Sequence, residues 1–181
     1  MTITLHQLTD CQSIDYLFAE TLLTTSFPCE EYRDLTEWKT YTLERTLFHN
    51  QVAKVEQGGE YTPIGLICYW DFGRFIYIEH LATSPQAHNG GYGSQILRLL
   101  QQQNRPLILE VEEPNDEITQ RRITFYQRNG FTLWQTPYLQ PPYRTGDEMI
   151  PLKLMAWGNL SEAEDFEIIK QTIYREVYNV Q

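Results

Sequence analysis

A glycine-rich stretch near the middle of the chain has the residue types needed to hold an anion. It runs Leu81-Ala-Thr-Ser-Pro-Gln-Ala-His-Asn-Gly-Gly-Tyr-Gly-Ser94, which is typical of a strand end, a turn and the start of a helix. Glycine lacks a Cβ atom, so such a turn can take positive φ and approach a ligand closely. The first N–H groups of a helix stabilise a phosphate. The stretch therefore predicts a phosphorylated ligand, and a glycine turn without a ligand is the alternative.

Two better-known phosphate loops do not fit this stretch. A P-loop needs Lys followed by Ser or Thr after its last glycine, and a dinucleotide-binding turn needs a third glycine where Ile96 stands. The ligand must therefore be inferred from the rest of the chain.

Length, charge and cysteine content exclude several classes of protein. The 181 residues, 41% of them hydrophobic, suit one domain with one core. A formal net charge of −10 opposes binding to nucleic acid or anionic membranes. The sequence has no membrane-length apolar run and no signal-peptide pattern at Met1, so we expect a cytoplasmic protein. Cys11, Cys29 and Cys68 are widely spaced, which favours neither a disulfide framework nor a metal site.

The elements that must position the glycine turn alternate between strands and helices. Before the glycine turn we expect a strand at 3–8, a helix after Ser13, a less regular helix from Pro28 to about Phe48, and strands at 51–56, 63–70 and 75–83. After it we expect a helix from Gly91 to about Gln103, a strand at 107–111, and a helix after Asn115 or Asp116 that ends at Asn129-Gly130. The chain should then form a strand at 131–134, a proline-rich loop, a strand at 149–157 and a helix after Ser161. A right-handed crossover makes strand 107–111 parallel to strand 75–83 and places the glycine turn at the carboxyl end of the sheet.

Some local patterns predict which side chains are buried or cap a helix. The first helix should bury one face, formed by Ile14, Leu17, Phe18 and Leu22. In the last helix, Ser161 and Glu164 have the spacing of a capping box. Its buried face should hold Phe166, Ile169, Ile173 and Val177.

A second motif identifies the family that the chain resembles. Phe125-Tyr126-Gln-Arg-Asn-Gly130-Phe131 follows the glycine stretch, with strand 107–111 between them. Together the two motifs resemble the GNAT superfamily of acyl-CoA-dependent N-acetyltransferases, over most of the chain up to about Trp157. The resemblance implies an α/β fold with a mixed, mostly antiparallel central sheet flanked by helices. We expect a single domain over residues 1–181, with a core at 1–158 and an added C-terminal helix at 159–181.

The resemblance implies acetyl-CoA as co-substrate, wedged between strands 75–83 and 107–111. The family's Arg/Gln-x-x-Gly-x-Gly/Ala loop, whose amides hold the pyrophosphate, is matched by His88, Asn89, Gly90, Gly91, Tyr92 and Gly93, followed by Ser94. His88 departs from the usual Arg or Gln. The backbone of Leu81 and Thr83 would pair with the pantetheine arm and direct an amide at the thioester carbonyl, where it stabilises an oxyanion.

Tyr126 falls on the family's tyrosine near the coenzyme sulfur, which can protonate the leaving thiolate. The alternative is a helix tyrosine that only packs beside Phe125. Thr119 and Arg122 stand where the family often has Asn and Ala, so coenzyme contacts from that turn are open.

A base must take a proton from an amine that is charged at neutral pH. Our first candidate is Glu79, which precedes Leu81 by two residues and should share its strand face, with His80 on the opposite face. A glutamate at a solvated sheet end is the alternative. Glu110 and Glu112 are reserve candidates, and the strip from Glu110 to Glu113 could instead bind a cationic amine by charge.

The predicted activity is direct acetyl transfer to a primary amine through a ternary complex, without a covalent enzyme intermediate. Aminoglycosides, polyamines, amino acids and protein amines are all open as acceptors, and a homodimer is possible. The loop from Tyr138 to Arg144 is expected to cover the acceptor. A non-catalytic acyl-CoA-binding module is the first alternative, and an interaction protein built on the helix from Ser161 to Tyr178 is the second.

Overall fold

A computed structural model describes residues 2–87 and 90–180, which form one eight-stranded sheet with helices on both faces. The elements in chain order are β1 (Thr2–Gln7), α1 (Ile14–Ser26), η1 (Cys29–Glu31), α2 (Leu35–Glu44), β2 (Phe48–Gln57), β3 (Glu60–Asp71), β4 (Ile76–Thr83), η2 (Pro85–Ala87), α3 (Tyr92–Gln101), β5 (Leu107–Glu112), α4 (Glu117–Arg128), β6 (Thr132–Leu133), β7 (Tyr138–Gln140), β8 (Ile150–Trp157) and α5 (Glu162–Glu176). Apart from β7, which lies in the predicted proline-rich loop, the order of the main helices and strands agrees with the predicted one.

The sheet has the strand order β1-β2-β3-β4-β5-β8-β6, and β7 also pairs with β8. Only β4 and β5 are parallel, as the crossover through α3 predicts, and the other pairs are antiparallel. The predicted mixed, mostly antiparallel sheet is confirmed.

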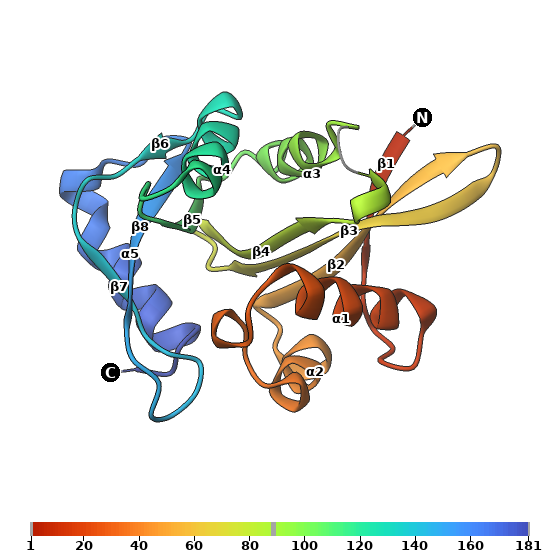
Figure 1. Ribbon diagram of the computed structural model, residues 1–181, viewed down its shortest axis with the longest axis horizontal. Coiled ribbons are helices and arrows are strands. Elements are labelled where there is room, and N and C mark those ends of the chain that lie inside the picture. The colour runs from red at the N-terminus through yellow and green to blue at the C-terminus, as the bar shows by residue number, and fades with distance from the viewer. Residues whose placement is uncertain (1, 88–89, 181) are drawn as a thin grey trace.

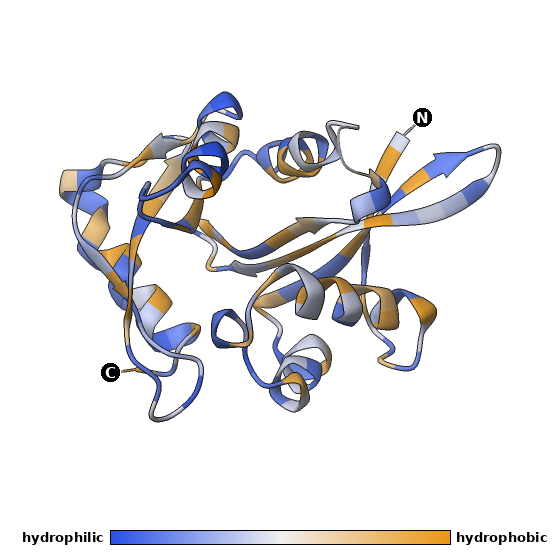
Figure 2. Ribbon diagram, in the orientation of Figure 1, coloured by the Kyte–Doolittle hydropathy of each residue, from blue (hydrophilic) through white to orange (hydrophobic). Residues whose placement is uncertain are grey.

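Two apolar clusters lie on the two faces of the sheet. In Figure 1, α3 and α4 cover one face, and α1 and α2 cover the other, which we call the α3 face and the α1 face. The cluster on the α3 face includes Ile96, Leu97 and Leu100, and the cluster on the α1 face includes Leu23 of α1 and Ile173 of α5. The hydropathy colours in Figure 2 show apolar segments on the strands and polar segments on the outer parts of the helices.

Several helix ends are formed by the residues that the sequence indicated. The side chain of Ser13 accepts a hydrogen bond from the backbone N–H of Tyr16 at the start of α1, and Asp116 caps α4 through Thr119. The irregular helix after Pro28 is η1 followed by α2, which begins at its cap Asp34.

Three local predictions are wrong. Of the predicted buried face of α1, Leu22 is buried and Phe18 is partly buried, but Ile14 and Leu17 are 82% and 54% exposed, because the helix also packs through Tyr16, Ala19 and Leu23. The proline-rich loop contains a strand, β7, because β8 offers it an edge to pair with. The predicted capping box at Ser161 does not form, since the backbone N–H of Ser161 donates to Asp165 Oδ2 at 2.8 Å.

The C-terminal helix α5 belongs to the core. Its predicted buried face is confirmed, and every residue of that face lies in the α1-face cluster. Among residues 2–87 and 90–180, no helix is long and apolar enough to cross a membrane.

Candidate active site

A cleft opens where the two parallel strands separate. β4 and β5 pair over only three residues, from Ile76 with Leu107 to Ile78 with Leu109. Beyond that point both strands continue without pairing to each other and line a cleft of about 1160 Å³. The cleft reaches from the N-terminus of α3 on one side of the sheet to η1 and the β7–β8 loop on the other. A ligand in it can therefore contact groups from both faces.

The glycine turn forms the end of the cleft on the α3 face. Gly91 is the N-cap of α3 and has φ of 67°, a left-handed conformation that favours glycine. A Cβ at Gly93 would lie 3.1 Å from the ring of Phe125, so glycine allows α3 to pack closely on α4. The amides of Gly93 and Ser94 lie in the first turn of α3, and both residues line the cleft. His88 and Asn89 lie outside the described residues.

Basic side chains of α4 lie at the same end of the cleft. Arg121, Arg122 and Arg128 line it together with Ser94. Arg121 and Arg128 are seven residues apart, which places them on one side of a helix. The start of α3 and these guanidinium groups form a site whose charge fits a diphosphate and a further phosphate. The two residues that the sequence left open in this turn have different surroundings. Thr119 caps the helix with Asp116, whereas Arg122 lines the cleft and pairs with Glu112 at 2.5 Å.

The backbone of β4 is open toward the cleft. The N–H of Ser84 donates to the carbonyl of Ile64 on β3 at 2.8 Å. Since backbone groups of an antiparallel strand alternate between its two edges, those of Leu81 and Thr83 face away from β3. Beyond Ile78 no residue of β5 pairs with this edge. It can therefore bind an extended, amide-containing chain.

Tyr126 lines the cleft from α4. Its ring packs edge-on against Phe125 and Phe131, with centroids 5.1 and 5.6 Å away. Burial raises the pKa of Tyr126 to about 12, so its hydroxyl stays protonated at neutral pH and can donate a proton or a hydrogen bond. Packing beside Phe125 is therefore compatible with a position in the site.

A β-bulge in β4 changes the expected strand faces. The register with β3 passes from Cys68 opposite His80 to Tyr69 opposite Ile78, which leaves Glu79 with no residue directly opposite it in the β3 backbone register. Glu79 and His80 consequently both contact Tyr143 on the α1 face, whereas Leu81 packs in the α3-face cluster. The prediction that Glu79 shares a face with Leu81 and lies opposite His80 is wrong, because strict alternation fails at a bulge.

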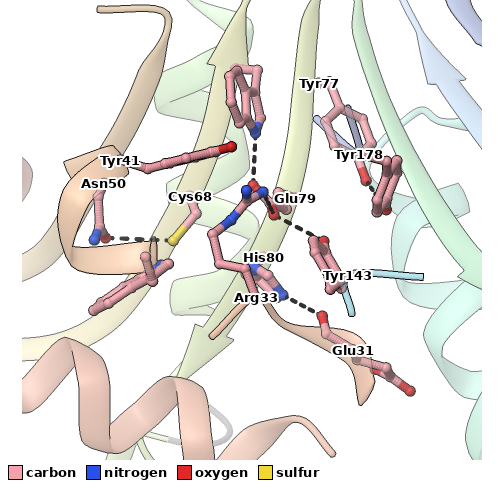
Figure 3. Close-up of polar contacts among 12 residues, drawn as sticks. Glu31, Arg33, Tyr41, Asn50, Cys68, Tyr77, Glu79, His80, Tyr143 and Tyr178 are labelled. Atoms are coloured by element: carbon pink, nitrogen blue, oxygen red, sulfur yellow. Dashed lines mark hydrogen bonds and ion pairs between the residues drawn. The ribbon is translucent and has the colours of Figure 1, made fainter. Parts of the chain in front are cut away.

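Glu79 lies inside a network of hydrogen bonds and an ion pair (Figure 3). Arg33 Nη2 lies 2.5 Å from Glu79 Oε1, Tyr143 donates to the same oxygen at 2.9 Å, and Trp70 Nε1 donates to Oε2 at 2.7 Å. The side chain of Glu79 is only 1% exposed, so the alternative of a solvated glutamate is wrong. Although burial opposes ionisation, Arg33 and the hydrogen bonds lower the pKa of Glu79 below its ordinary value. Its role as a base stays a prediction.

The surroundings of the neighbouring His80 favour its neutral form. Its Nε2 lies 2.9 Å from the carbonyl oxygen of Glu31, its Nδ1 is buried without a hydrogen-bond partner, and burial lowers its pKa.

The reserve candidate Glu110 lines the cleft from β5 and is surrounded by tyrosines. Tyr138 donates to Glu110 Oε1, and Tyr178 donates to Oε2 at 2.8 Å. The hydroxyl of Tyr178 also lies 3.3 Å from that of Tyr77. Burial raises the pKa of Glu110 to about 7.

Two functional candidates, Arg33 and Tyr178, had no sequence signal. Tyr138 and Tyr143 belong to the loop that was expected to cover the acceptor; Gln140 and Tyr143 of that loop line the cleft, and its role toward the acceptor stays a prediction. Arg33 comes from the segment between η1 and α2, and its guanidinium lies over the rings of Tyr41 and Tyr143, 4.3 and 5.2 Å from their centroids. These residues meet only through tertiary packing. In contrast, the seven-residue spacing of Arg121 and Arg128 could have indicated from the sequence that one side of this helix is basic.

The last helix brings Tyr178 into this site. The buried face of α5 packs on the α1-face cluster, and Tyr178 follows the helix directly. The idea of a separate interaction helix does not fit this packing, and truncation at Gly158 would remove core residues together with a partner of Glu110.

Comparisons with known proteins agree with this architecture. A family model described as an acetyltransferase (GNAT) domain matches residues 48–133. A solved protein of Bacteroides thetaiotaomicron, assigned to the GNAT family of acetyltransferases, has 45% identity and a TM-score of 0.91 over 98% of this chain and 99% of its own. YjbC of Bacillus subtilis (strain 168), assigned as an acetyltransferase, is 26% identical over 155 residues, which are 83% of this chain and 76% of YjbC. The spermidine N-acetyltransferase of Vibrio cholerae, solved with CoA and spermine, has 17% identity and a TM-score of 0.60 over 85% of this chain and 94% of its own.

The first of these proteins is similar over nearly its whole length, and the cleft has a glycine turn at a helix N-terminus and an open strand edge, which suit a coenzyme A thioester. The chain therefore belongs to the GNAT family of acetyltransferases, with acetyl-CoA as its co-substrate.

Proposed function

We propose that this protein transfers an acetyl group directly from acetyl-CoA to the nitrogen of a primary amine. The observation that carries the proposal is the separation of β4 and β5, which lets groups from both faces of the sheet reach one point. The α3 face supplies the coenzyme site, and the α1 face supplies the acceptor site.

The coenzyme would be held by its phosphates and its pantetheine arm. The amides of Gly91, Gly93 and Ser94, with Gly90 and Tyr92 in the same turn, are proposed to hold the diphosphate. The backbone of Leu81 and Thr83 would pair with the extended arm as a neighbouring strand does. Contacts of His88 and Asn89 with the coenzyme stay predictions, because both residues lie outside the described part of the chain.

Two groups would then act on the thioester. A backbone N–H at the end of β4 would donate to the carbonyl oxygen as negative charge develops there. Tyr126 would donate to the sulfur as the carbon–sulfur bond breaks, because its raised pKa keeps its proton in place until a thiolate forms.

The acceptor end of the cleft favours a cationic amine. Its walls include the carboxylates of Glu31, Glu79 and Glu110 together with the aromatic ring of Tyr143. A carboxylate wall attracts an ammonium group and an aromatic face accommodates it. The likeness to the spermidine enzyme concerns the fold, so the choice among polyamines, aminoglycosides, amino acids and peptides is left to experiment.

No cysteine lies among the residues that line the described part of the cleft. We therefore propose attack by the amine itself, without an acyl-enzyme intermediate. A homodimer stays a prediction.

The test is release of coenzyme A thiol from acetyl-CoA with a panel of primary amines. The wild-type protein should release thiol in an amine-dependent manner. Tyr126→Phe should lower kcat about 10²-fold, at the lower end of the range for general acids, and leave the affinity for acetyl-CoA unchanged. Tyr16→Phe, which removes a buried hydroxyl outside the cleft, is the matched control and should keep most of kcat. Coenzyme binding without turnover on any amine would favour the non-catalytic module instead.

A further inference from the structure

Two glutamates follow the last paired residues of the separating strands. Ile78 of β4 pairs with Leu109 of β5, and the next residues along the two strands are Glu79 and Glu110. Both side chains contact tyrosines on the α1 face, which is the proposed acceptor side. Each carboxylate therefore lies at the point where the amine must meet the thioester.

Glu79 is poorly suited to take a proton. Its two oxygens accept three hydrogen bonds, from Arg33, Tyr143 and Trp70, and its side chain is 1% exposed. Protonation would break a buried ion pair and leave the charge of Arg33 uncompensated. The guanidinium thus stabilises the ionised form of Glu79 and weakens it as a base.

Glu110 has the opposite surroundings. Both of its oxygens accept hydrogen bonds from neutral hydroxyls, those of Tyr138 and Tyr178, and the residue is partly exposed to the cleft. In the part of the chain that the structure describes, no Lys, Arg or His nitrogen lies within 4.0 Å of it. A carboxylate held by hydroxyls alone can accept a proton without breaking an ion pair.

The ionisable groups around Glu110 act in both directions. Burial raises its pKa most, and the negative charge of Glu79 adds to that effect. The hydrogen bonds from Tyr138, Tyr178 and Tyr77 lower it, and the balance gives a pKa of about 7. A base with this pKa is ionised at mildly alkaline pH and is still basic enough to hold a proton.

We propose, building on the acetyl transfer proposed above, that Glu110 accepts the proton that the acceptor ammonium must lose. Tyr138 and Tyr178 act as positioning residues, because their hydroxyls fix both carboxylate oxygens. The C-terminal segment thereby completes the acceptor site, and Glu79 supplies fixed negative charge beside it.

The step balances as follows. The ammonium gives one proton to Glu110, directly or through one water, and becomes a neutral amine with a free electron pair. That pair forms a bond to the thioester carbon, and the carbon–sulfur bond then breaks with its electrons on sulfur. The thiolate takes one proton from Tyr126, the new amide nitrogen gives its second proton back to Tyr126 through water, and Glu110 returns its proton to water. One proton is released for each amine acetylated.

The first test is the pH dependence of kcat/KM for the amine, measured with wild type and Glu110→Gln at saturating acetyl-CoA. We expect the wild-type profile to rise through an apparent pKa near 7. Glu110→Gln should lose about 10²-fold or more in kcat/KM at pH 8 and should lack this rise. Glu113→Gln is the matched control, because Glu113 follows the same strand but does not line the cleft. Wild-type activity with the same pH rise in Glu110→Gln would overturn the proposal.

A second measurement does not need an acceptor. In protein labelled with ¹³C at the glutamate carboxyl group, with coenzyme A present, we expect one resonance to titrate near pH 7 and to be absent from Glu110→Gln. No such resonance would overturn the proposal even if the enzyme acetylates amines. If wild type turns over no amine, the proposed function fails, and the titration still decides whether Glu110 can exchange a proton at neutral pH.

Tyr178→Phe tests the positioning role. Loss of a hydrogen bond to the carboxylate should move the rise in kcat/KM to higher pH and lower kcat more than it changes KM for acetyl-CoA. Tyr16→Phe is the control, since Tyr16 is a buried tyrosine of α1 that does not line the cleft. A Tyr178→Phe protein with reduced thermal stability but an unmoved pH profile would show that Tyr178 is only structural.

Discussion

Glu79 and Glu110 each follow the last paired residue of β4 and β5, yet their surroundings shift their pKa values in opposite directions. Glu79 is paired with Arg33 and its pKa is lowered, whereas Glu110 is bound by two tyrosine hydroxyls and its pKa is raised to about 7. The strand position brings each carboxylate to the cleft. Whether it serves as fixed charge or as a proton acceptor depends on the partner that tertiary packing provides.

The difference also separates a permanent charge from a switchable one. Arg33 keeps Glu79 ionised throughout the neutral range, so the acceptor site always has one negative charge near it. Glu110 gains and loses a proton in that range. An amine acetyltransferase needs both properties, because it must attract an ammonium group and then remove its charge.

The largest expected effect comes from removing the cation that distinguishes the two glutamates. Arg33→Met should destabilise the protein by about 3–5 kcal/mol, because it leaves the carboxylate of Glu79 buried without its partner. The free energy of unfolding at pH 7, from urea titration, measures this loss. Adding Glu79→Gln to Arg33→Met should restore part of the stability.

The control for this change is an exposed ion pair. Arg121 and Glu117 are 79% and 85% exposed, so Arg121→Met should alter stability by less than about 1 kcal/mol. Equal small effects at both sites would contradict the assignment of Arg33 as the group that holds Glu79 ionised.

A second prediction contrasts how the two glutamates affect stability across pH. The folded-state pKa of Glu110 lies above its ordinary value of 4.5, so this group favours folding below pH 4.5 and loses that contribution as pH rises through about 7. Glu110→Gln should therefore be more stable than wild type at pH 8.5. The gain should be at most about 3 kcal/mol, since the residue is partly exposed, and it should vanish below pH 4.5.

Glu79 should show the reverse sign. Its folded-state pKa is lowered, so its contribution to stability is present above pH 4.5 and is lost as pH falls through the folded-state value. Glu79→Gln should be less stable than wild type at pH 8.5, with a deficit that shrinks in acid. Urea unfolding of both variants between pH 4 and 8.5 compares the signs, and the same sign for both would refute the contrast.

Local sequence patterns predicted the geometry of the glycine-turn end of the cleft better than that of the end on the α1 face. The glycine turn, the helix after it and the motif around Tyr126 are continuous in sequence, and their geometry follows from short-range rules such as positive φ at Gly91. The acceptor side joins residues far apart in the chain. Arg33 and Glu79 are 46 positions apart and Glu110 and Tyr178 are 68 apart, so no spacing rule could connect them.

Two errors have local physical causes. The bulge at Glu79 inserts an unpaired residue, which moves Glu79 and His80 to one face and cannot be read from alternation. In α1, the apolar side chains of Ile14 and Leu17 indicated the wrong buried face, because the helix packs through Tyr16 and Ala19. The catalytic role of Tyr126 stays a prediction. The role of Glu79 as the base is untested, and our proposal gives that role to Glu110.

The smallest effect concerns the coenzyme side alone. Gly91→Ala should weaken binding of coenzyme A about 10-fold, because alanine is strained at φ of 67° and the added methyl group would lie at the proposed phosphate site. Gly59→Ala has a similar strain at φ of 85° in the β2–β3 turn and should leave binding unchanged. Calorimetric titration measures both, and equal affinities in the two variants would argue against the glycine turn as the phosphate site.

The most direct test of the two-sided cleft is a crystal structure with coenzyme A and a primary alkylamine bound. We predict the diphosphate at Gly91 to Ser94, the sulfur between β4 and β5 beside Tyr126, and the amine on the α1 face within hydrogen-bond reach of Glu110 or one water away from it. Coenzyme bound outside this cleft, or an amine nitrogen on the α3 face remote from Glu110, would contradict the account.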